Sequence, residues 1–176
     1  MKIHVLGASC SGTTTLGMVL SEHVGCPYFD SDQYFWKPSE PPFTIRREPH
    51  ERNAMLHEDL LLHDNWIIGG SVINWGEEWL TAFDLVVFLY IPPAIRLQRL
   101  KNRELERYGD VIFTNPERAL QYQQFLEWAT AYDTDAISGR TLKAHEAWLS
   151  KLSCSVLEIR GDTSVQERLN LVLGKL

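Results

Sequence analysis

The sequence has few cysteines, and their positions do not suit disulfide bonds. Three occur among 176 residues, at positions 10, 26 and 154, so any pairing leaves one over, and none forms a C-x-x-C pair. Disulfide frameworks and zinc-binding cysteine pairs use even numbers of cysteines at short spacings. We therefore expect a reduced, cytoplasmic protein that depends on a hydrophobic core instead of cross-links.

Long apolar runs are also missing. Residues 3–6 form a short apolar run that is followed by small polar residues, whereas a signal peptide needs about 7 to 15 apolar residues and a membrane span about 20. We expect neither export nor membrane insertion. The chain is 44% hydrophobic and 23% charged, and a usual domain has about 100 to 200 residues. Residues 1–176 are thus predicted to form a single domain.

Positive charge is in deficit. Lys and Arg number 17 against 23 Asp and Glu, a formal net charge of −6. Binders of nucleic acid or of acidic membranes need a basic surface, so we expect neither partner. One stretch, residues 96–107, reverses the balance with five basic residues against two acidic ones. Such a segment suits a small anionic ligand.

Apolar periodicity predicts strands that alternate with helices. Residues 85–91 are the most apolar stretch and are rich in β-branched side chains, as buried strands are. Alternation of this kind requires parallel strands joined by right-handed crossovers. We therefore predict an α/β fold, a three-layer α/β/α sandwich with about five parallel strands. The expected strands are residues 2–6, 27–29, 66–68, 85–91 and 156–159, and the expected helices are residues 13–24, 49–62, 74–82, 94–107, 116–131, 141–151 and 164–173.

A glycine-rich segment lies between the first expected strand and the first expected helix. It matches the phosphate-binding pattern G-x-x-x-x-G-K-[ST] at every fixed position except the lysine, which is Thr13. Two glycines let successive backbone N–H groups and the positive end of the helix converge on a phosphate. Thr14 would then offer its hydroxyl to Mg²⁺. The segment predicts binding of ATP or GTP with Mg²⁺ by Gly7, Ala8, Ser9, Cys10, Ser11, Gly12, Thr13, Thr14 and Thr15.

The same segment allows a second, less favoured interpretation. It resembles the dinucleotide pattern G-x-G-x-x-G with Ser9 at the middle glycine, and Asp30 lies at the acidic position about 20 residues on. However, the middle glycine is absent, no Tyr-x-x-x-Lys pair occurs, and 176 residues leave little room for a separate substrate domain. Binding of NAD or NADP therefore remains only an alternative.

At this point the sequence resembles the P-loop kinases of nucleotides and small molecules, such as adenylate, shikimate and gluconate kinases. More narrowly, it is similar to adenylate-kinase-like proteins whose glycine loop carries Thr where Lys is usual. The motifs that carry this resemblance are residues 7–15, 29–32, 66–71 and 83–89. An Arg-bearing turn with which adenylate kinases hold a monophosphate is missing from residues 69–75. The resemblance therefore implies the wider fold family more than adenylate kinase activity itself.

This resemblance also implies roles for the residues after the second and third strands. It places Asp30 and Asp32 beside Mg²⁺ and the acceptor hydroxyl. It makes Gly69 and Gly70, followed by Ser71, a turn that the acceptor substrate approaches.

Chemistry supports the same roles for the two aspartates. Phosphoryl transfer needs held Mg²⁺, neutralised charge, and a carboxylate that orients the acceptor or accepts its proton. We predict Asp32 for the last task and Asp30, with Thr14, as a metal ligand. A helix N-cap and a solvated turn residue are the alternative roles for the two aspartates.

The absence of lysine at position 13 requires another cation at the phosphates. Arg99, Arg103 and Arg107 lie four apart, so on a helix they form one ridge. Guanidinium groups suit phosphate oxygens, and we predict that Arg99 and Arg103 act catalytically in place of the lysine. A solvated helix face is the alternative.

We assign this ridge to a lid of about residues 96–140, as the resemblance implies. Glu104 and Glu106 fall off the ridge and are expected to leave it unneutralised. Arg140 is a second lid cation.

Proline clusters in one place. Residues 37–49 hold four of the eight prolines, which predicts an acceptor-binding loop of about residues 33–50. Trp36 could stack on a base or ring, and Arg46 could bind an anionic group of the acceptor. Core packing and ordinary loop charges are the alternatives.

These patterns together predict a kinase that transfers a phosphoryl group to a nucleotide, a nucleoside or another small metabolite, as a monomer or homodimer. A catalytically weak nucleotide-binding regulatory module is the alternative, and Thr13 is the residue that favours it.

Overall fold

Five parallel strands form one sheet in the computed structural model, which describes residues 1–134 and 139–176. Their spatial order is β2 (Tyr28–Asp30), β3 (Trp66–Gly69), β1 (Lys2–Gly7), β4 (Leu85–Tyr90) and β5 (Ser155–Arg160). The central strand β1 pairs with β3 in the register Ile3↔Ile67 and with β4 in the register Val5↔Val87. Because the strands are parallel, the loops that follow them meet at one edge of the sheet.

Alternate side chains of β1 face two different cores. Ile3 and Val5 point to a core that they form with α1 (Thr13–Val24) and α8 (Val165–Leu173). Leu16 and Leu20 are four apart, so they lie on one face of α1, and both are fully buried. Each buried side chain of this size contributes about 1.5–3 kcal/mol, which holds the start of α1 against the sheet.

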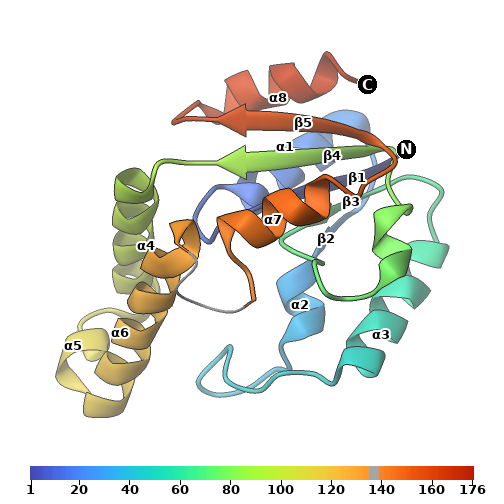
Figure 1. Cartoon of the computed structure of the whole chain (residues 1–176). Helices are drawn as coiled ribbons and strands as arrows, with labels where there is room; N and C mark the ends of the chain where they lie inside the picture. The colour runs from blue at the N-terminus through green and yellow to red at the C-terminus, as the bar shows by residue number, and fades with distance from the viewer. Residues whose placement is uncertain (135–138) are drawn as a thin grey trace.

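The opposite face of the sheet carries an aromatic core. Leu6 packs there against α3 (Pro49–Leu61), α7 (Leu142–Leu149) and the 3₁₀ helix η1 (Glu77–Leu80). Trp79 of η1 is 1% exposed. Helices therefore cover both faces, as Figure 1 shows, and the predicted three-layer α/β/α fold with five parallel strands is confirmed.

A helical excursion follows β4. It consists of α4 (Pro93–Tyr108), α5 (Val111–Thr114), α6 (Pro116–Thr130) and the 3₁₀ helix η2 (Ala131–Asp133). In Figure 1 these helices extend beyond the edge of the sheet at which the strands end. The predicted lid of residues 96–140 falls here, although its residues 135–138 lie outside the described residues. Among the helices described, none has the length and apolar character that a bilayer crossing requires.

Some short elements differ from the sequence prediction. Residues 31–35 form a short helix, α2 (Ser31–Phe35), directly after β2, and the helix expected at residues 74–82 is reduced to η1. Sequence periodicity needs a window of about 11 to 18 residues, so it cannot detect a helix as short as α2, which has five residues.

The strand order argues against the dinucleotide alternative. In that fold the second strand lies directly beside the first. Here β3 lies between β1 and β2, so the acidic residue at the end of β2 is one strand further from the glycine loop.

Candidate functional site

The glycine loop leaves the N-terminus of α1 open. Cys10 and Gly12 adopt left-handed backbone conformations, with φ of +63° and +93°. Gly12 is the N-cap of α1, and no side chain caps this end. The first N–H groups of a helix, here including those of Thr13 and Thr14, have no carbonyl partner within the helix. The loop therefore presents free donors and a positive helix end, the arrangement that binds phosphate.

The loop residues differ in exposure. Gly7 ends β1 so tightly that a side chain would overlap the Leu89 carbonyl oxygen and the Ser11 hydroxyl. Ala8 and Ser11 are buried, Ser9, Cys10, Gly12 and Thr13 are half-buried, and Thr14 and Thr15 are exposed. A bound ligand can therefore reach the side chains of the last loop residues, Thr14 and Thr15.

The side chains of Thr14 and Asp30 are in contact beside the glycine loop, at the N-terminus of α1. Thr14 Oγ1 donates to Asp30 Oδ2 at 3.2 Å, and the Asp32 N–H donates to Asp30 Oδ1 at 3.0 Å. Asp30 is thus the N-cap of α2, the alternative role that the sequence left open. Burial is the largest influence on the pKa of the Asp30 carboxyl and raises it above its usual range.

The Thr14–Asp30 pair offers the oxygen ligands that Mg²⁺ prefers. Magnesium is usually held by one or two protein oxygens together with water and substrate phosphates. Residues 1–134 and 139–176 contain no group of three or more His, Cys, Asp or Glu that could hold a metal. The hydroxyl and the carboxylate therefore fit an ion shared with bound phosphates, and not an all-protein cage.

Asp32 is exposed in the first turn of α2. Arg140 lies near it: burial lowers the pKa of Arg140, and the charge of Asp32 is the largest influence in the opposite direction. The Arg140 guanidinium also lies over the Trp128 ring, 5.2 Å from its centroid. The structure thus brings the predicted proton acceptor close to one of the predicted lid cations.

The turn after β3 is pinned against α2. Gly70 has φ of +94°, and a side chain there would overlap Ser31 Oγ. The Ser71 N–H donates to the same Ser31 oxygen at 3.1 Å. A side chain at Gly69 would overlap the Tyr28 ring of β2. Because Ser31 lies between the two aspartates in the sequence, the predicted acceptor turn is fixed directly beside them.

A buried polar network continues from this turn to the end of the lid. Ser71 Oγ lies 3.2 Å from His145 Nε2, and His145 Nδ1 lies 2.7 Å from the Tyr132 hydroxyl. Burial lowers the pKa of His145 to about 3, so its ring is neutral. Sequence analysis missed this network, because a single histidine on a helix forms no motif.

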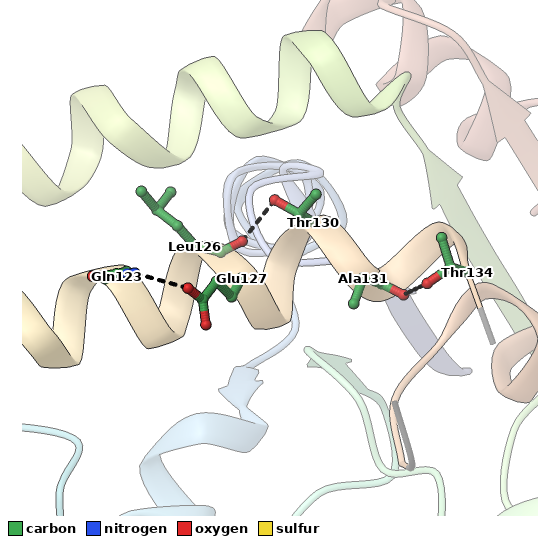
Figure 2. Close-up of a pocket in the computed structure, with 6 residues that line it drawn as sticks. All are labelled: Gln123, Leu126, Glu127, Thr130, Ala131 and Thr134. Atoms are coloured by element: carbon green, nitrogen blue, oxygen red, sulfur yellow. Dashed lines mark hydrogen bonds between the residues drawn. The ribbon is translucent and has the colours of Figure 1, made fainter. Parts of the chain in front are cut away.

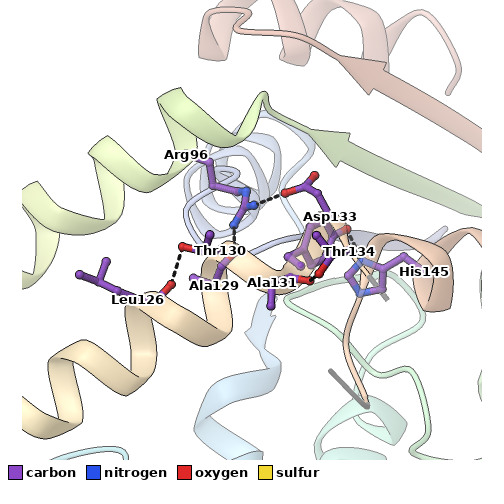
Figure 3. A network of polar contacts seen from close by, with 9 residues as sticks. Arg96, Leu126, Ala129, Thr130, Ala131, Asp133, Thr134 and His145 are labelled. Carbon is purple, nitrogen blue, oxygen red and sulfur yellow. Dashed lines mark hydrogen bonds and ion pairs between the residues drawn. The ribbon is translucent and has the colours of Figure 1, made fainter. Parts of the chain in front are cut away.

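Arg96, at the start of the basic segment, is structural. It is 1% exposed and donates to the Ala129 carbonyl oxygen at 2.8 Å and to Asp133 Oδ2 at 2.5 Å (Figure 3). The guanidinium therefore joins α4 to the end of α6 and to η2.

The expectation of an unneutralised arginine ridge is wrong. Arg99 forms an ion pair with Asp162, in the loop between β5 and α8. Arg103 donates from Nη2 to Glu104 Oε1 at 3.1 Å. Neighbours on a helix point in different directions, but the long Arg103 side chain reaches back to its buried neighbour. Two of the three ridge arginines therefore have carboxylate partners.

The ridge nevertheless lies near the glycine loop. Burial raises the pKa of the Cys10 thiol, and the charge of Arg103 is the largest influence that opposes it. Arg96 and Arg107 act in the same direction, and Glu104 acts against them. The basic segment thus places positive charge beside the loop, while the catalytic roles of Arg99 and Arg103 remain predictions.

The proline-rich loop closes on itself at its base. Trp36 and Arg46 form an isolated antiparallel bridge, and the Arg46 guanidinium lies 5.7 Å from the Phe35 ring and 5.8 Å from the Trp36 ring. At the tip, Arg107 of α4 lies over Phe43, 5.3 Å from the ring centroid. The predicted acceptor loop and the predicted lid are therefore in contact.

Sequence analysis also missed Arg52, a buried cation on α3. It is 8% exposed, and its guanidinium lies 4.3 Å from the Trp75 ring and 5.5 Å from the Phe35 ring. In the part of the chain that the structure describes, its hydrogen bond goes to Asn53 and no carboxylate pairs with it. Only the burial of a charged residue marks it, and the sequence carries no signal for that.

A hollow of about 440 Å³ lies elsewhere, along α6 and η2. Figure 2 shows its lining residues, which include Leu126, Thr130 and Ala131. No residue of the glycine loop or of the acceptor turn lines it, so it is separate from the candidate site.

Comparisons with known proteins agree with this fold. The family model described as "AAA domain" matches residues 3–117. Protein YqaC of Bacillus subtilis, which is uncharacterised, is 44% identical over 99% of this chain and 97% of its own. The shikimate kinase of Acinetobacter baylyi is 28% identical over 68% of this chain and 71% of its own. The structure of deoxyadenosine kinase from M. mycoides with bound dATP has a TM-score of 0.59 at 14% identity, covering 99% of this chain and 98% of its own.

Proposed function

The chain belongs to the AAA-domain family and has the fold of the P-loop kinases, and from this premise we propose that it is an Mg²⁺-dependent kinase. ATP or GTP is the phosphoryl donor, and the acceptor is a small molecule with a hydroxyl or phosphate group.

One observation carries the proposal: the Thr14 hydroxyl and the Asp30 carboxylate meet 3.2 Å apart at the open end of α1. The helix end and the loop donors bind the phosphates of the nucleotide. Thr14 and Asp30 supply oxygen ligands for Mg²⁺, which neutralises phosphate charge when bound. Asp30 caps α2 through Oδ1, and its other oxygen, Oδ2, is the one in contact with Thr14.

Asp32 acts on the acceptor in this proposal. Its carboxylate accepts the proton of the acceptor hydroxyl as the oxygen bonds to the γ-phosphorus. The bond between the γ-phosphorus and the bridging oxygen breaks, and the nucleoside diphosphate leaves. Ser31 and Ser71 hold the acceptor turn in register with Asp32 through their 3.1 Å hydrogen bond.

The acceptor side favours an anionic compound. Arg46 and Arg52 both lie near the Phe35 ring, 5.7 Å and 5.5 Å from its centroid, and neither has a carboxylate partner in the described ranges. A buried guanidinium without a counter-ion is costly, so an acceptor carboxylate or phosphate would complete this cluster. An anionic hydroxy acid and a nucleoside monophosphate both meet this requirement.

Two measurements test the proposal in order. Calorimetric titration with ATP, GTP, NAD⁺ and NADP⁺, each with and without Mg²⁺, should show Mg²⁺-dependent binding of a nucleoside triphosphate. ADP or GDP release is then measured with anionic hydroxy acids, nucleoside monophosphates and neutral nucleosides. An absence of Mg²⁺-dependent triphosphate binding would refute the kinase.

Thr13 supports a second candidate, a nucleotide-binding module without catalysis. A lysine at this position contacts the β- and γ-phosphates, and Thr13 cannot carry that charge. Tight Mg²⁺–nucleotide binding without turnover across the three acceptor classes would favour this module over the kinase.

A further inference from the structure

A second arginine that sequence analysis did not single out lies directly behind the glycine loop. Arg168 belongs to α8 and is 3% exposed. Its Nη1 donates to the Ser11 carbonyl oxygen at 2.9 Å, and its Nε donates to Thr163 Oγ1 at 2.9 Å. A side chain at Gly12 would come within 2.8 Å of the same Nη1. The guanidinium is therefore in direct contact with the back of the loop.

Among the residues that the structure describes, no carboxylate pairs with the charge of Arg168. Within residues 1–134 and 139–176, both of its hydrogen bonds go to uncharged oxygens. The acidic groups with an influence on Arg168 are Asp162 and Glu167, but Asp162 pairs with Arg99, and Glu167 accepts the N–H of Ser164, the N-cap of α8. Burial of an unpaired guanidinium costs free energy, and an anion bound on the other side of the loop would offset that cost.

The hydrogen bond also acts on the donors of the loop. The Ser11 carbonyl and the Gly12 N–H belong to one peptide group. A charged donor on that carbonyl withdraws electrons from the peptide and strengthens the N–H as a donor, since linked hydrogen bonds polarise one another. Arg168 therefore increases the attraction of the loop for phosphate without touching the ligand.

We propose that Arg168 is a positioning residue that supplies, from behind the glycine loop, part of the positive charge that Thr13 does not carry. The inference rests on the proposed nucleotide site. It reassigns the compensating role from the ridge arginines to a residue 157 positions away from Ser11. Because the backbone N–H groups of such a loop cradle the α- and β-phosphates, its effect should be larger on ADP and ATP, which carry a β-phosphate, than on AMP.

The test compares AMP, ADP and ATP binding by calorimetry in wild type, Arg168→Gln, Arg168→Lys and Arg168→Gln with Thr13→Lys. We expect Arg168→Gln to weaken the binding of ADP and ATP about tenfold and the binding of AMP less than about twofold. The tenfold change corresponds to the loss of one charge-assisted hydrogen bond. Arg168→Lys keeps the charge and should recover most of the affinity. Thr13→Lys in the Gln background should recover it as well.

Arg160→Gln is the matched control. Arg160 is an exposed arginine near the start of α8 whose partners are Glu146 and Glu158, and its loss should leave the ADP to AMP affinity ratio unchanged. If Arg168→Gln lost AMP and ADP affinity equally, or if adding Thr13→Lys to it restored no ADP affinity, Arg168 would have only a structural role. Either result would overturn the inference.

Two further readouts keep the test decisive. If Arg168→Gln does not fold, as thermal unfolding will show, Thr13→Lys alone is informative. With Arg168 present it should tighten ADP binding less than about threefold, and a gain of tenfold or more would overturn the inference. Failure of the proposed function is distinct, because wild type itself would then bind neither ADP nor ATP.

Discussion

Thr14 and Asp30 lie 3.2 Å apart, oxygen to oxygen, although one is in the first turn of α1 and the other ends β2. Strand β3 separates β2 from β1 in the sheet, and α1 packs across β3 and β2, so Thr14 reaches the end of a strand that does not pair with β1. It exists because parallel strands end at a common edge, and α1 begins at that edge.

Removal of either partner should abolish the Mg²⁺ dependence of nucleotide binding. For Thr14→Ala and Asp30→Asn we expect Mg²⁺ to strengthen ATP binding at least about tenfold less than in wild type, about 1.4 kcal/mol. The measurement is calorimetric titration of ATP with and without Mg²⁺. Thr81→Ala is the control, because Thr81 is exposed and precedes β4, at the opposite edge of the sheet. Full Mg²⁺ dependence in both site variants would contradict the assignment.

Arg96 should contribute to stability far more than Arg99. Arg96→Met leaves the Asp133 carboxylate and the Ala129 carbonyl oxygen without their donor, and the Asp133 side chain is 17% exposed. We expect the free energy of unfolding to fall by about 2–3 kcal/mol, below the full penalty for a buried pair because water reaches Asp133. Arg99→Met, at a half-exposed ion pair, should cost less than about 1 kcal/mol. Equal costs in urea unfolding would contradict this difference.

The fold was predictable because its signals are local. The apolar strand runs, the helical spacing of Leu16 and Leu20, and the glycine loop between them are each contained within a few residues. The loop sequence likewise singled out Thr14, whose hydroxyl contacts Asp30 in the structure. Helix α2 was not predictable, since its five residues are shorter than the window in which periodicity is measured.

Charge partners were not predictable for a different reason. Arg99 pairs with a residue 63 positions away, and Arg168 contacts the loop across 157 positions. Such contacts depend on how α4 and α8 pack, which a helical pattern does not specify. The sequence correctly placed basic residues near the loop, but only the structure shows that Arg99 and Arg103 are paired and that Arg168 lies behind Ser11.

Gly70 should be intolerant of a side chain. Gly70→Ala combines a positive φ of +94° with overlap on Ser31 Oγ. Gly25→Ala is a matched control, because Gly25 has φ of +70° and open space around it. The backbone conformation costs about 1–2 kcal/mol in either variant, and overpacking at Gly70 adds roughly 1–3 kcal/mol. Urea unfolding of both variants measures the difference, and equal losses would show that α2 shifts freely to make room.

Two buried histidines should make the protein lose stability as the pH falls below about 6.5. Burial lowers the pKa of His4 to about 4 and that of His145 to about 3, whereas the unfolded chain takes up protons near 6.5. Between these values the unfolded state binds more protons, so the free energy of unfolding decreases by about 1.4 kcal/mol per pH unit for each histidine. Around His145, the charges of Arg140 and His4 lower its pKa in the same direction as burial does.

The variant His145→Gln tests this pH dependence. Urea unfolding between pH 7 and 5 gives the slope of the free energy of unfolding against pH, and the variant should lose the part of that slope that comes from proton uptake by one histidine. An unchanged slope in His145→Gln would mean that His145 takes up its proton in the folded protein, and would refute the neutral Ser71–His145–Tyr132 network.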